Sequence, residues 1–293
     1  GVVSFDYGSA AFPLNQQSTV GVSFFRSGVN DIKNTLDAWD AERNQPKANY
    51  ESYISTFSAA DYAFFLSYAR AASENLSVGV TGKVIRRTIG PFAEAWGYSF
   101  DVGAQYRIGR LQLGLNLQDV AGMYQSWTVN ADEFNTNDEV NPATGSPYTF
   151  TETFGQELPT GGTYVVPPVA RLGTGYAIPF GTSSLTLGAD FDLAFDGQEN
   201  YAFNAGPMSI HPRFGTEFNY KNVLSLRAGV ARIAPGPSDE LQFTPTLGAG
   251  LQLAQVNLDY GFGDFAGLTS DLGMTHRIAA RLTLERPSSV RSR

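Results

Sequence analysis

Residues 185–195 read LTLGADFDLAF, and their side chains alternate strictly between two kinds. The odd positions carry Leu, Ala and Phe, whereas the even positions carry Thr, Gly, Asp and Ala. Because successive side chains of a β-strand point to opposite faces, this pattern predicts a strand with one apolar face. The same period of two recurs in NLSVGVTGKV at residues 75–84 and in LQLGLNLQ at residues 111–118. The chain is therefore predicted to consist mainly of strands.

The predicted strands are unusually long, at roughly 10 to 14 residues, where globular strands have about 5 or 6. Aromatic residues stand near their ends, as in the interfacial girdle of a membrane barrel. The opposite face carries Gly, Ser, Thr, Asn and charges, which would form a poor core in a soluble sandwich. We therefore predict an all-β fold, a transmembrane antiparallel up-and-down β-barrel. About thirteen strands follow from the alternation, at residues 2–13, 18–27, 59–71, 75–88, 95–108, 110–121, 163–178, 183–196, 207–220, 223–233, 240–252, 255–264 and 273–285.

The composition excludes several classes of protein. Charged residues make up 16% of the 293 residues, below the share of about a quarter in soluble domains. The mean hydropathy is −0.17, and no apolar run approaches the ~20 residues of a membrane helix, so a helical membrane protein is excluded. A net charge of −8 argues against nucleic-acid binding. The absence of Cys excludes a disulfide framework and a thiolate metal site.

Connections between the predicted strands alternate between short and long. Bacterial barrels have short periplasmic turns and longer outer loops. We therefore expect a single outer-membrane barrel domain over residues 1–293, with long extracellular loops at 27–58 and 121–162 and a periplasmic C-terminus. Such barrels also have an even number of strands. We therefore expect a fourteenth strand and a signal peptide to precede this sequence.

Four segments carry a family resemblance: residues 2–32, 76–87 (LSVGVTGKVIRR), 98–120 and 260–285, the last including Leu272, Gly273, Met274, Thr275, His276, Arg277 and Ile278. They resemble the PorV/PorQ-like family of FadL-like outer-membrane barrels. The resemblance covers most strands but neither long loop. It implies a 14-stranded barrel and a role in the type IX secretion system, which passes cargo proteins to the cell surface. Other FadL-like barrels move hydrophobic small molecules into the membrane.

The two long loops are candidate partner-binding surfaces, because aromatic residues amid polar ones are typical of protein-recognition sites. An equally weighted alternative is that the loops pack on themselves and occlude the barrel mouth. The aromatic residues in question are Trp39, Tyr50, Tyr124, Trp127, Phe134, Tyr148, Phe150 and Phe154.

A second candidate site is the lumen, which could be a polar conduit or a wall held together by ion pairs without transport. Buried charges must pair in either case. Alternation places these polar residues inward: Asp101, Gln105, Arg107, Arg171, Asp190, Asp192, Arg213, Glu217, Arg227, Asp259, Arg277 and Arg281.

No metal, cofactor or catalytic site is expected. His211 and His276 lie on separate predicted strands, and the acidic stretch Asp132, Glu133, Asp138 and Glu139 lacks the EF-hand spacing. Nucleophile-elbow, zinc-protease and phosphate-loop motifs are also absent, so an enzyme is not expected.

Three functions remain open. The first is a barrel that binds secreted or surface proteins and other envelope components through its loops. The second is a FadL-like transporter of hydrophobic small molecules, in which Pro167, Pro168, Pro207, Pro212 or Pro245 could open the wall. The third is a scaffold for a surface assembly. In each, outer-membrane lipid surrounds the barrel, and lipid or detergent could occupy the lumen.

Overall fold

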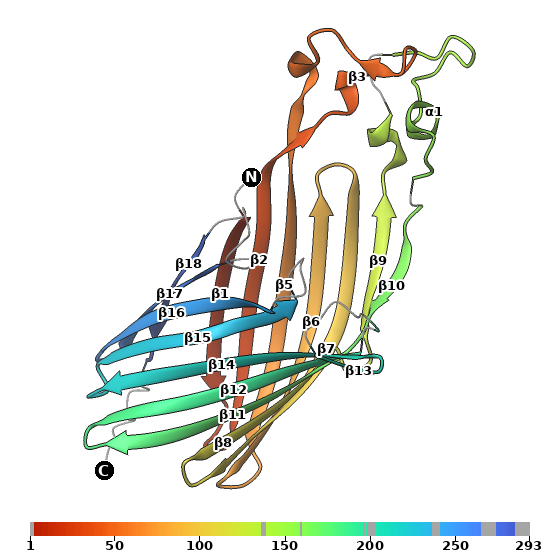
Figure 1. Cartoon of the computed structure of the whole chain (residues 1–293). Helices are drawn as coiled ribbons and strands as arrows, with labels where there is room; N and C mark the ends of the chain where they lie inside the picture. Colours follow the sequence, from red (N-terminus) through yellow and green to blue (C-terminus); the bar gives the residue numbers. More distant parts are fainter. Residues whose placement is uncertain are drawn as a thin grey trace, which may run out of the picture. The chain divides into compact units, whose positions relative to one another are not determined.

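The computed structural model describes residues 3–135, 139–158, 160–195, 197, 203–235, 241–264 and 274–284. Leu272, Gly273 and Asp138 lie outside these residues. Almost all of the described regular structure is antiparallel β-strand (Figure 1). Within the described residues, no helix is both long enough and apolar enough to cross a membrane.

Thirteen strands follow one another along the main path of the sheet, as the alternation predicted. The order of these strands in the sheet is the same as their order in the sequence, which is an up-and-down arrangement. The path consists of β1 (Val3–Pro13), β2 (Ser18–Asn34), β5 (Ser55–Ala71), β6 (Leu76–Ile89), β7 (Ala93–Ile108), β8 (Leu111–Gln118), β11 (Val169–Phe180), β12 (Ser183–Ala194), β14 (Met208–Tyr220), β15 (Leu224–Pro235), β16 (Leu241–Leu253), β17 (Val256–Asp264) and β18 (Met274–Leu282).

Several predicted strand ends are wrong. β2 continues to Asn34 and β5 begins at Ser55, so the predicted loop 27–58 is shorter in the structure. The ladder between these strands shifts register between Val29 and Ile32, where Asp31 has a φ of 58°. A bulge therefore interrupts the alternation without ending the strand, which is why the sequence pattern stopped too early.

The predicted loop 121–162 contains a further strand. The predicted strand 110–121 ends at Gln118, and after a turn β9 (Met123–Val129) pairs with the first residues of β7. The predicted strand 163–178 is two strands, β10 (Gly162–Val166) and β11. Pro167 and Pro168 separate them, because neither residue has an N–H to donate to the ladder. The aromatic residues Tyr124 and Trp127 consequently lie on a strand and not in a loop.

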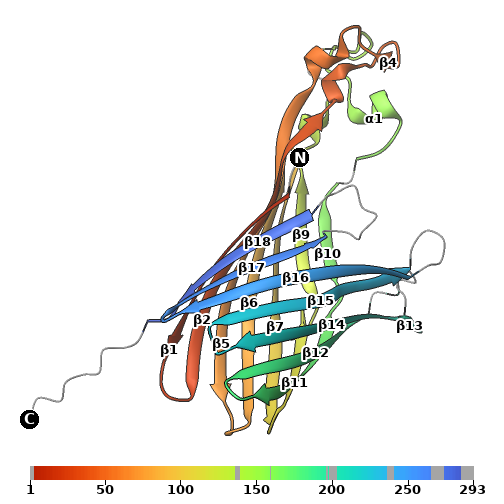
Figure 2. The ribbon, with the colours of Figure 1, turned by 60° about the vertical axis from the view of Figure 1, so that its left-hand side comes forward.

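The chain forms two compact units. Unit 1 comprises Gly1–Ala71, Val78–Val102 and Asp119–Pro168, and it includes both long loops. Unit 2 comprises Ala72–Ser77, Gly103–Gln118 and Val169–Arg293. Figure 2 shows the successive strands of each unit from a second direction.

Each unit has an apolar face that is exposed. Leu66 of unit 1 and Leu247 of unit 2 are 62% and 60% exposed. Alternate positions carry small and charged side chains, and we call this side of the sheet the polar face. A sheet that exposes its apolar side chains and gathers its charges on the other side is suited to lipid outside and water inside. The distribution is the reverse of that in a soluble domain.

Candidate functional site

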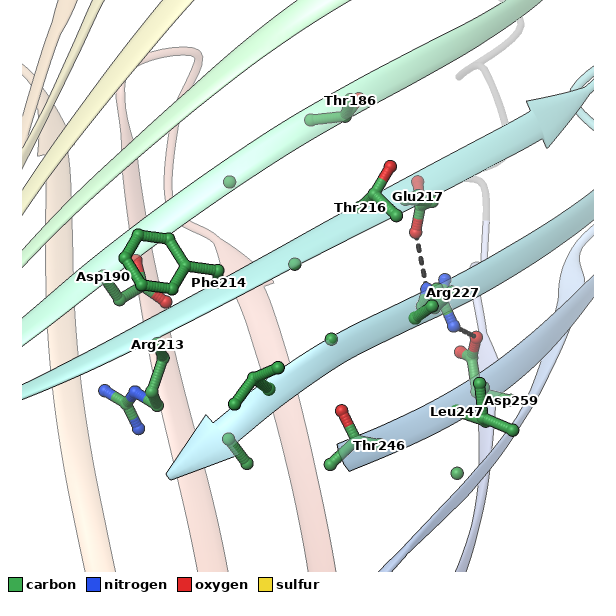
Figure 3. Close-up of a pocket in the computed structure, with 18 of the residues that line it drawn as sticks. Thr186, Asp190, Arg213, Phe214, Thr216, Glu217, Arg227, Thr246, Leu247 and Asp259 are labelled. Atoms are coloured by element: carbon green, nitrogen blue, oxygen red, sulfur yellow. Dashed lines mark hydrogen bonds and ion pairs between the residues drawn. The ribbon is translucent and has the colours of Figure 1, made fainter. Parts of the chain in front are cut away.

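A chain of three charged residues crosses the polar face of unit 2. The Nε of Arg227 on β15 lies 2.5 Å from Glu217 Oε2 on β14, and its Nη1 lies 2.6 Å from Asp259 Oδ1 on β17 (Figure 3). Asp259 is two strands away from Arg227. The side chain can span that distance because the intervening strand β16 has glycine at 248 and 250.

A second charged cluster lies on β11, β12 and β14. Asp192 Oδ1 forms ion pairs with two arginines, at 2.5 Å from Arg213 Nη2 and 3.4 Å from Arg171 Nε. Asp190, one alternate position along β12, is directly opposite Arg213 in the ladder. The Nε of Arg213 is buried and has no hydrogen-bond partner among the described residues. Two guanidinium groups therefore share one carboxylate, and one of them keeps an unused donor.

Small residues form a continuous row across the polar face between these clusters. Gly175, Gly188, Gly215 and Gly229 are opposite one another in successive ladders, and Thr246 continues the row. Glycine has no side chain, so the backbone itself forms a flat floor here. A hollow of about 530 Å³ lies over this part of the sheet. Arg213, Glu217, Arg227 and Asp259 are among the residues that line it (Figure 3). Arg277 of β18 also lines it.

A smaller hollow of about 330 Å³ adjoins the first within unit 2. Its polar lining includes Gln105, Arg107, Gln112 and Asp190. Asp190 lines both hollows, so the two share one wall. Arg281 lies opposite Asn257 on β17, in the alternating register of Arg277 and Asp259.

Unit 1 contains a buried charge cluster that the sequence analysis missed. Lys83 Nζ lies 2.7 Å from Asp101 Oδ1 and 2.7 Å from Asp119 Oδ1, and Ser99 donates its hydroxyl to Asp119. The Lys83 side chain is only 8% exposed. The backbone N–H of Asp119, whose φ is 51°, donates to Asp101 at 2.9 Å. The cluster therefore fixes the turn that ends β8 and precedes β9.

The two long loops of unit 1 pack on each other. We call residues 35–54 and 130–161 the loop cap. It contains η1 (Leu36–Ala38), β3 (Trp39–Asp40), β4 (Gln45–Pro46), η2 (Tyr50–Tyr53), η3 (Ala131–Phe134) and α1 (Phe150–Phe154). A series of aromatic rings, with centroids 4.9–6.2 Å apart, begins outside the loop cap and continues into it. Its order is Phe57, Phe92, Phe134, Phe150, Phe154 and Trp39.

Polar contacts join the same two loops. Glu139 accepts the backbone N–H of Ala41 at 2.7 Å and lies 3.1 Å from Lys47 Nζ. Lys47 Nζ also lies 4.8 Å from the centre of the Tyr53 ring. Desolvation, followed by the charges of nearby carboxylates such as Glu42 and Glu139, raises the pKa of the Tyr148 hydroxyl. Tyr148 thus remains a neutral phenol amid acidic side chains.

Of the eight loop aromatics singled out from the sequence, four take part in this ring series: Trp39, Phe134, Phe150 and Phe154. Tyr50 of η2 is 47% exposed. On β9, Tyr124 stacks on Tyr98 of the apolar face at 5.6 Å. Trp127 lies under the Arg87 guanidinium at 5.9 Å.

The two histidines do not come together. His211 is opposite Asp192 on the ladder between β12 and β14. His276 Nδ1 lies 2.8 Å from the Tyr260 hydroxyl, beside Phe262 of β17. Among the residues that the structure describes, no group of three or more His, Cys, Asp or Glu could hold a metal ion.

Comparison with known proteins gives a fold and no close relative. No protein-family model matches the sequence, and no curated protein matches it. The toluene transporter TodX of Pseudomonas putida has a TM-score of 0.51 and 13% identity, over 89% of this chain and 81% of TodX. A FadL homologue of Pseudomonas aeruginosa has a TM-score of 0.48 and 15% identity, over 88% of this chain and 68% of that one. The toluene transporter TbuX of Ralstonia pickettii has a TM-score of 0.48 and 11% identity, over 96% and 87%.

The likeness to TodX shows the fold alone, which is the antiparallel outer-membrane β-barrel predicted from the sequence. It agrees with the exposed apolar face and with the location predicted from the sequence. The narrower resemblance to PorV/PorQ-like proteins, and the side of the membrane on which the loops lie, stay predictions.

Proposed function

We propose that this barrel admits small molecules through the outer membrane, as a FadL-like transporter. The observation that carries the proposal is the hollow of about 530 Å³ in unit 2, whose lining includes the glycine row and the charged residues beside it. This volume falls within the usual range of small-molecule sites, about 300–1,000 Å³. A wall that only anchored the barrel would not need a floor cleared of side chains across several neighbouring strands.

The lining favours an amphipathic solute over a pure hydrocarbon. The glycine floor offers flat, weakly polar contact for a ring or chain. Arg213 and Asp190 stand along one side of the glycine row, and Glu217 and Arg227 stand along the other.

Uptake by cells tests the proposal. A host without its own small-molecule uptake barrel would express the protein, and the entry of labelled toluene and labelled benzoate would be measured. We expect both solutes to enter faster, benzoate more so. Gly215→Leu should abolish the gain, because a Cβ at Gly215 meets only the Ala228 carbonyl at 3.7 Å and the rest of the side chain fills the hollow.

Gly82→Leu is the matched control. Gly82 lies on the strand β6 of unit 1, has no atom within 4 Å of an added Cβ, and is not part of the hollow. It should leave uptake unchanged at equal surface amounts. If neither solute enters faster than in cells without the barrel, the proposal is wrong.

Binding of secreted or surface proteins through the loop cap is the second candidate, in the manner of a type IX secretion component. It is favoured by exposed Tyr50 and by charge, since residues 121–162 contain six acidic residues and no Lys or Arg. A basic partner surface would fit. One observation argues against this candidate: four of the eight aromatic residues pack against other rings within the loop cap, which is the role expected of self-packing loops. Purification of the barrel from native membrane tests this candidate. If no secreted or surface protein co-purifies with it, both a transport role and a scaffold role for the loop cap are wrong.

A further inference from the structure

A polar hollow of about 510 Å³ lies in unit 1 at the turn between β1 and β2, next to the end of β5. Six residues line it: Asn15, Gln16, Gln17, Ser18, Tyr68 and Arg70. Nothing in the small-molecule path of unit 2 involves these residues.

Three of the lining residues, Ser18, Tyr68 and Arg70, belong to the alternating rows of the apolar face. Along β5, the alternate residues Phe64, Leu66 and Tyr68 are 54%, 62% and 41% exposed. Arg70 is the next alternate residue, so it belongs to the same lipid-facing row. The ladder between β2 and β5 sets Ser18 opposite Arg70 and Val20 opposite Tyr68. A charged side chain thus stands at the end of an apolar strip, immediately beyond a tyrosine.

The position of Arg70 along β5 matches the edge of a bilayer. At the other end of the strip, Tyr62 lies under the Arg26 guanidinium at 5.9 Å. Tyr62 and Arg70 are eight residues apart, which is ~27 Å along an antiparallel strand. At a strand tilt of ~40°, this stretch spans ~21 Å along the membrane normal, which is most of the ~25 Å apolar band of an outer-membrane barrel. The two arginines therefore mark the two boundaries of the lipid-facing strip.

These two arginines differ in their partners. Arg26 pairs with Asp6 at 3.0 Å. The Arg70 side chain has no ion pair or hydrogen bond to any residue in the part of the chain that the structure describes. Beside it, the Ser18 and Tyr68 hydroxyls are 3.1 Å apart. One hydroxyl donates to the other, which leaves one proton for an outside acceptor.

We propose that Arg70, Tyr68 and Ser18 form a binding site for the phosphate of a phospholipid headgroup in the leaflet that meets the short turns. A guanidinium group matches phosphate in charge and in its paired donors. The spare hydroxyl proton supplies a third donor. The acyl chains run along Leu66 and Val22 of the adjoining apolar strip, which water-soluble anions would not use.

Native mass spectrometry of the purified barrel in detergent tests this site. The probes are dioleoylphosphatidylglycerol, dioleoylglycerol, which lacks the phosphate, and inorganic phosphate. We expect the wild type to retain phosphatidylglycerol and not dioleoylglycerol. Arg70→Gln should lower retention about tenfold, as expected for the loss of a charge-assisted hydrogen-bond pair. Tyr68→Phe should lower it by a smaller factor.

Arg110→Gln is the matched control, because Arg110 is also exposed at a turn but does not line the hollow. It should retain phosphatidylglycerol as the wild type does. Equal retention by Arg70→Gln and wild type would overturn the proposal, and so would equal retention of dioleoylglycerol. If inorganic phosphate displaces the lipid completely, the site recognises the free anion and the lipid assignment fails.

Discussion

Arg227 of β15 pairs with Asp259 of β17 at 2.6 Å, across the whole width of β16. A Cβ built on Gly250 of β16 would lie 2.7 Å from Asp259 Oδ1 and 3.3 Å from Arg227 Nη1. The ion pair therefore requires that position 250 have no side chain. Cross-strand pairs normally join neighbours, whereas this one ties three strands together.

Gly250→Ala should separate Arg227 from Asp259 and lower the free energy of unfolding by about 1–3 kcal/mol, the usual cost of overpacking. Urea unfolding followed by tryptophan fluorescence measures the change. Gly188→Ala is the control, since its added Cβ meets nothing closer than 3.7 Å. Equal stability of the two variants would show that the bridge across β16 contributes nothing.

Lys83→Met should be among the most destabilising substitutions in unit 1. It leaves the carboxylates of Asp101 and Asp119, each with a side chain only 14% exposed, without their cation. Removing one partner of a buried ion pair costs about 3–5 kcal/mol. The triple variant with Asp101→Asn and Asp119→Asn should recover most of the loss in the same urea assay. A triple variant as unstable as Lys83→Met contradicts the charge argument.

Glu139→Gln should loosen the loop cap and leave the strands intact. The change weakens the contacts to Lys47 and to the Ala41 N–H, which join loops 98 residues apart in sequence. Amide hydrogen exchange in residues 36–53 should become about tenfold faster, as expected for the loss of roughly 1.4 kcal/mol. Arg43→Gln is the control, because the Arg43 side chain is 71% exposed and, among the described residues, forms an ion pair only with nearby Asp40. Unchanged exchange in both variants would exclude Glu139 as the link.

Acid should release the first turn of α1. Hydrogen bonds from the backbone and side chain of Thr149, and from Asn141, lower the pKa of Glu152 from its ordinary value of 4.5. Because the folded-state pKa is depressed, the stabilisation is present above the unfolded value and is lost as the pH falls through the folded value. Protection of the Thr149 amide, corrected for intrinsic exchange, should fall below about pH 4.5. In Glu152→Gln it should not change with pH over this range, and a pH-dependent loss in that variant would count against Glu152.

The strands could be predicted because alternation is a local property. One lipid-facing apolar face and one polar face impose a period of two on nearly every strand, and thirteen predicted strands correspond to the thirteen of the main path. The predicted strand ends are wrong where the alternation of side chains does not follow the pairing of the strands. The bulge at Asp31 breaks the alternation without ending β2, and Pro167 and Pro168 divide a segment whose alternation looks continuous.

The candidate sites were less predictable, for a different reason. Arg227, Glu217 and Asp259 were each placed on the polar face from the sequence, but their mutual contacts require the register of four strands. Alternation placed Asp101 on the polar face, but the buried cluster that it forms with Lys83 and Asp119 was missed, because that cluster depends on the turn after β8.

The sequence by itself determined that the chain is a membrane barrel of about thirteen visible strands, because burial in lipid acts on each strand separately. Only the tertiary structure decided that glycines of separate strands align into one floor, that the two long loops pack on each other, and that Arg70 lies beside Ser18 and Tyr68 at the end of an apolar strip. These are properties of register and packing between distant segments, and no short stretch of sequence contains them.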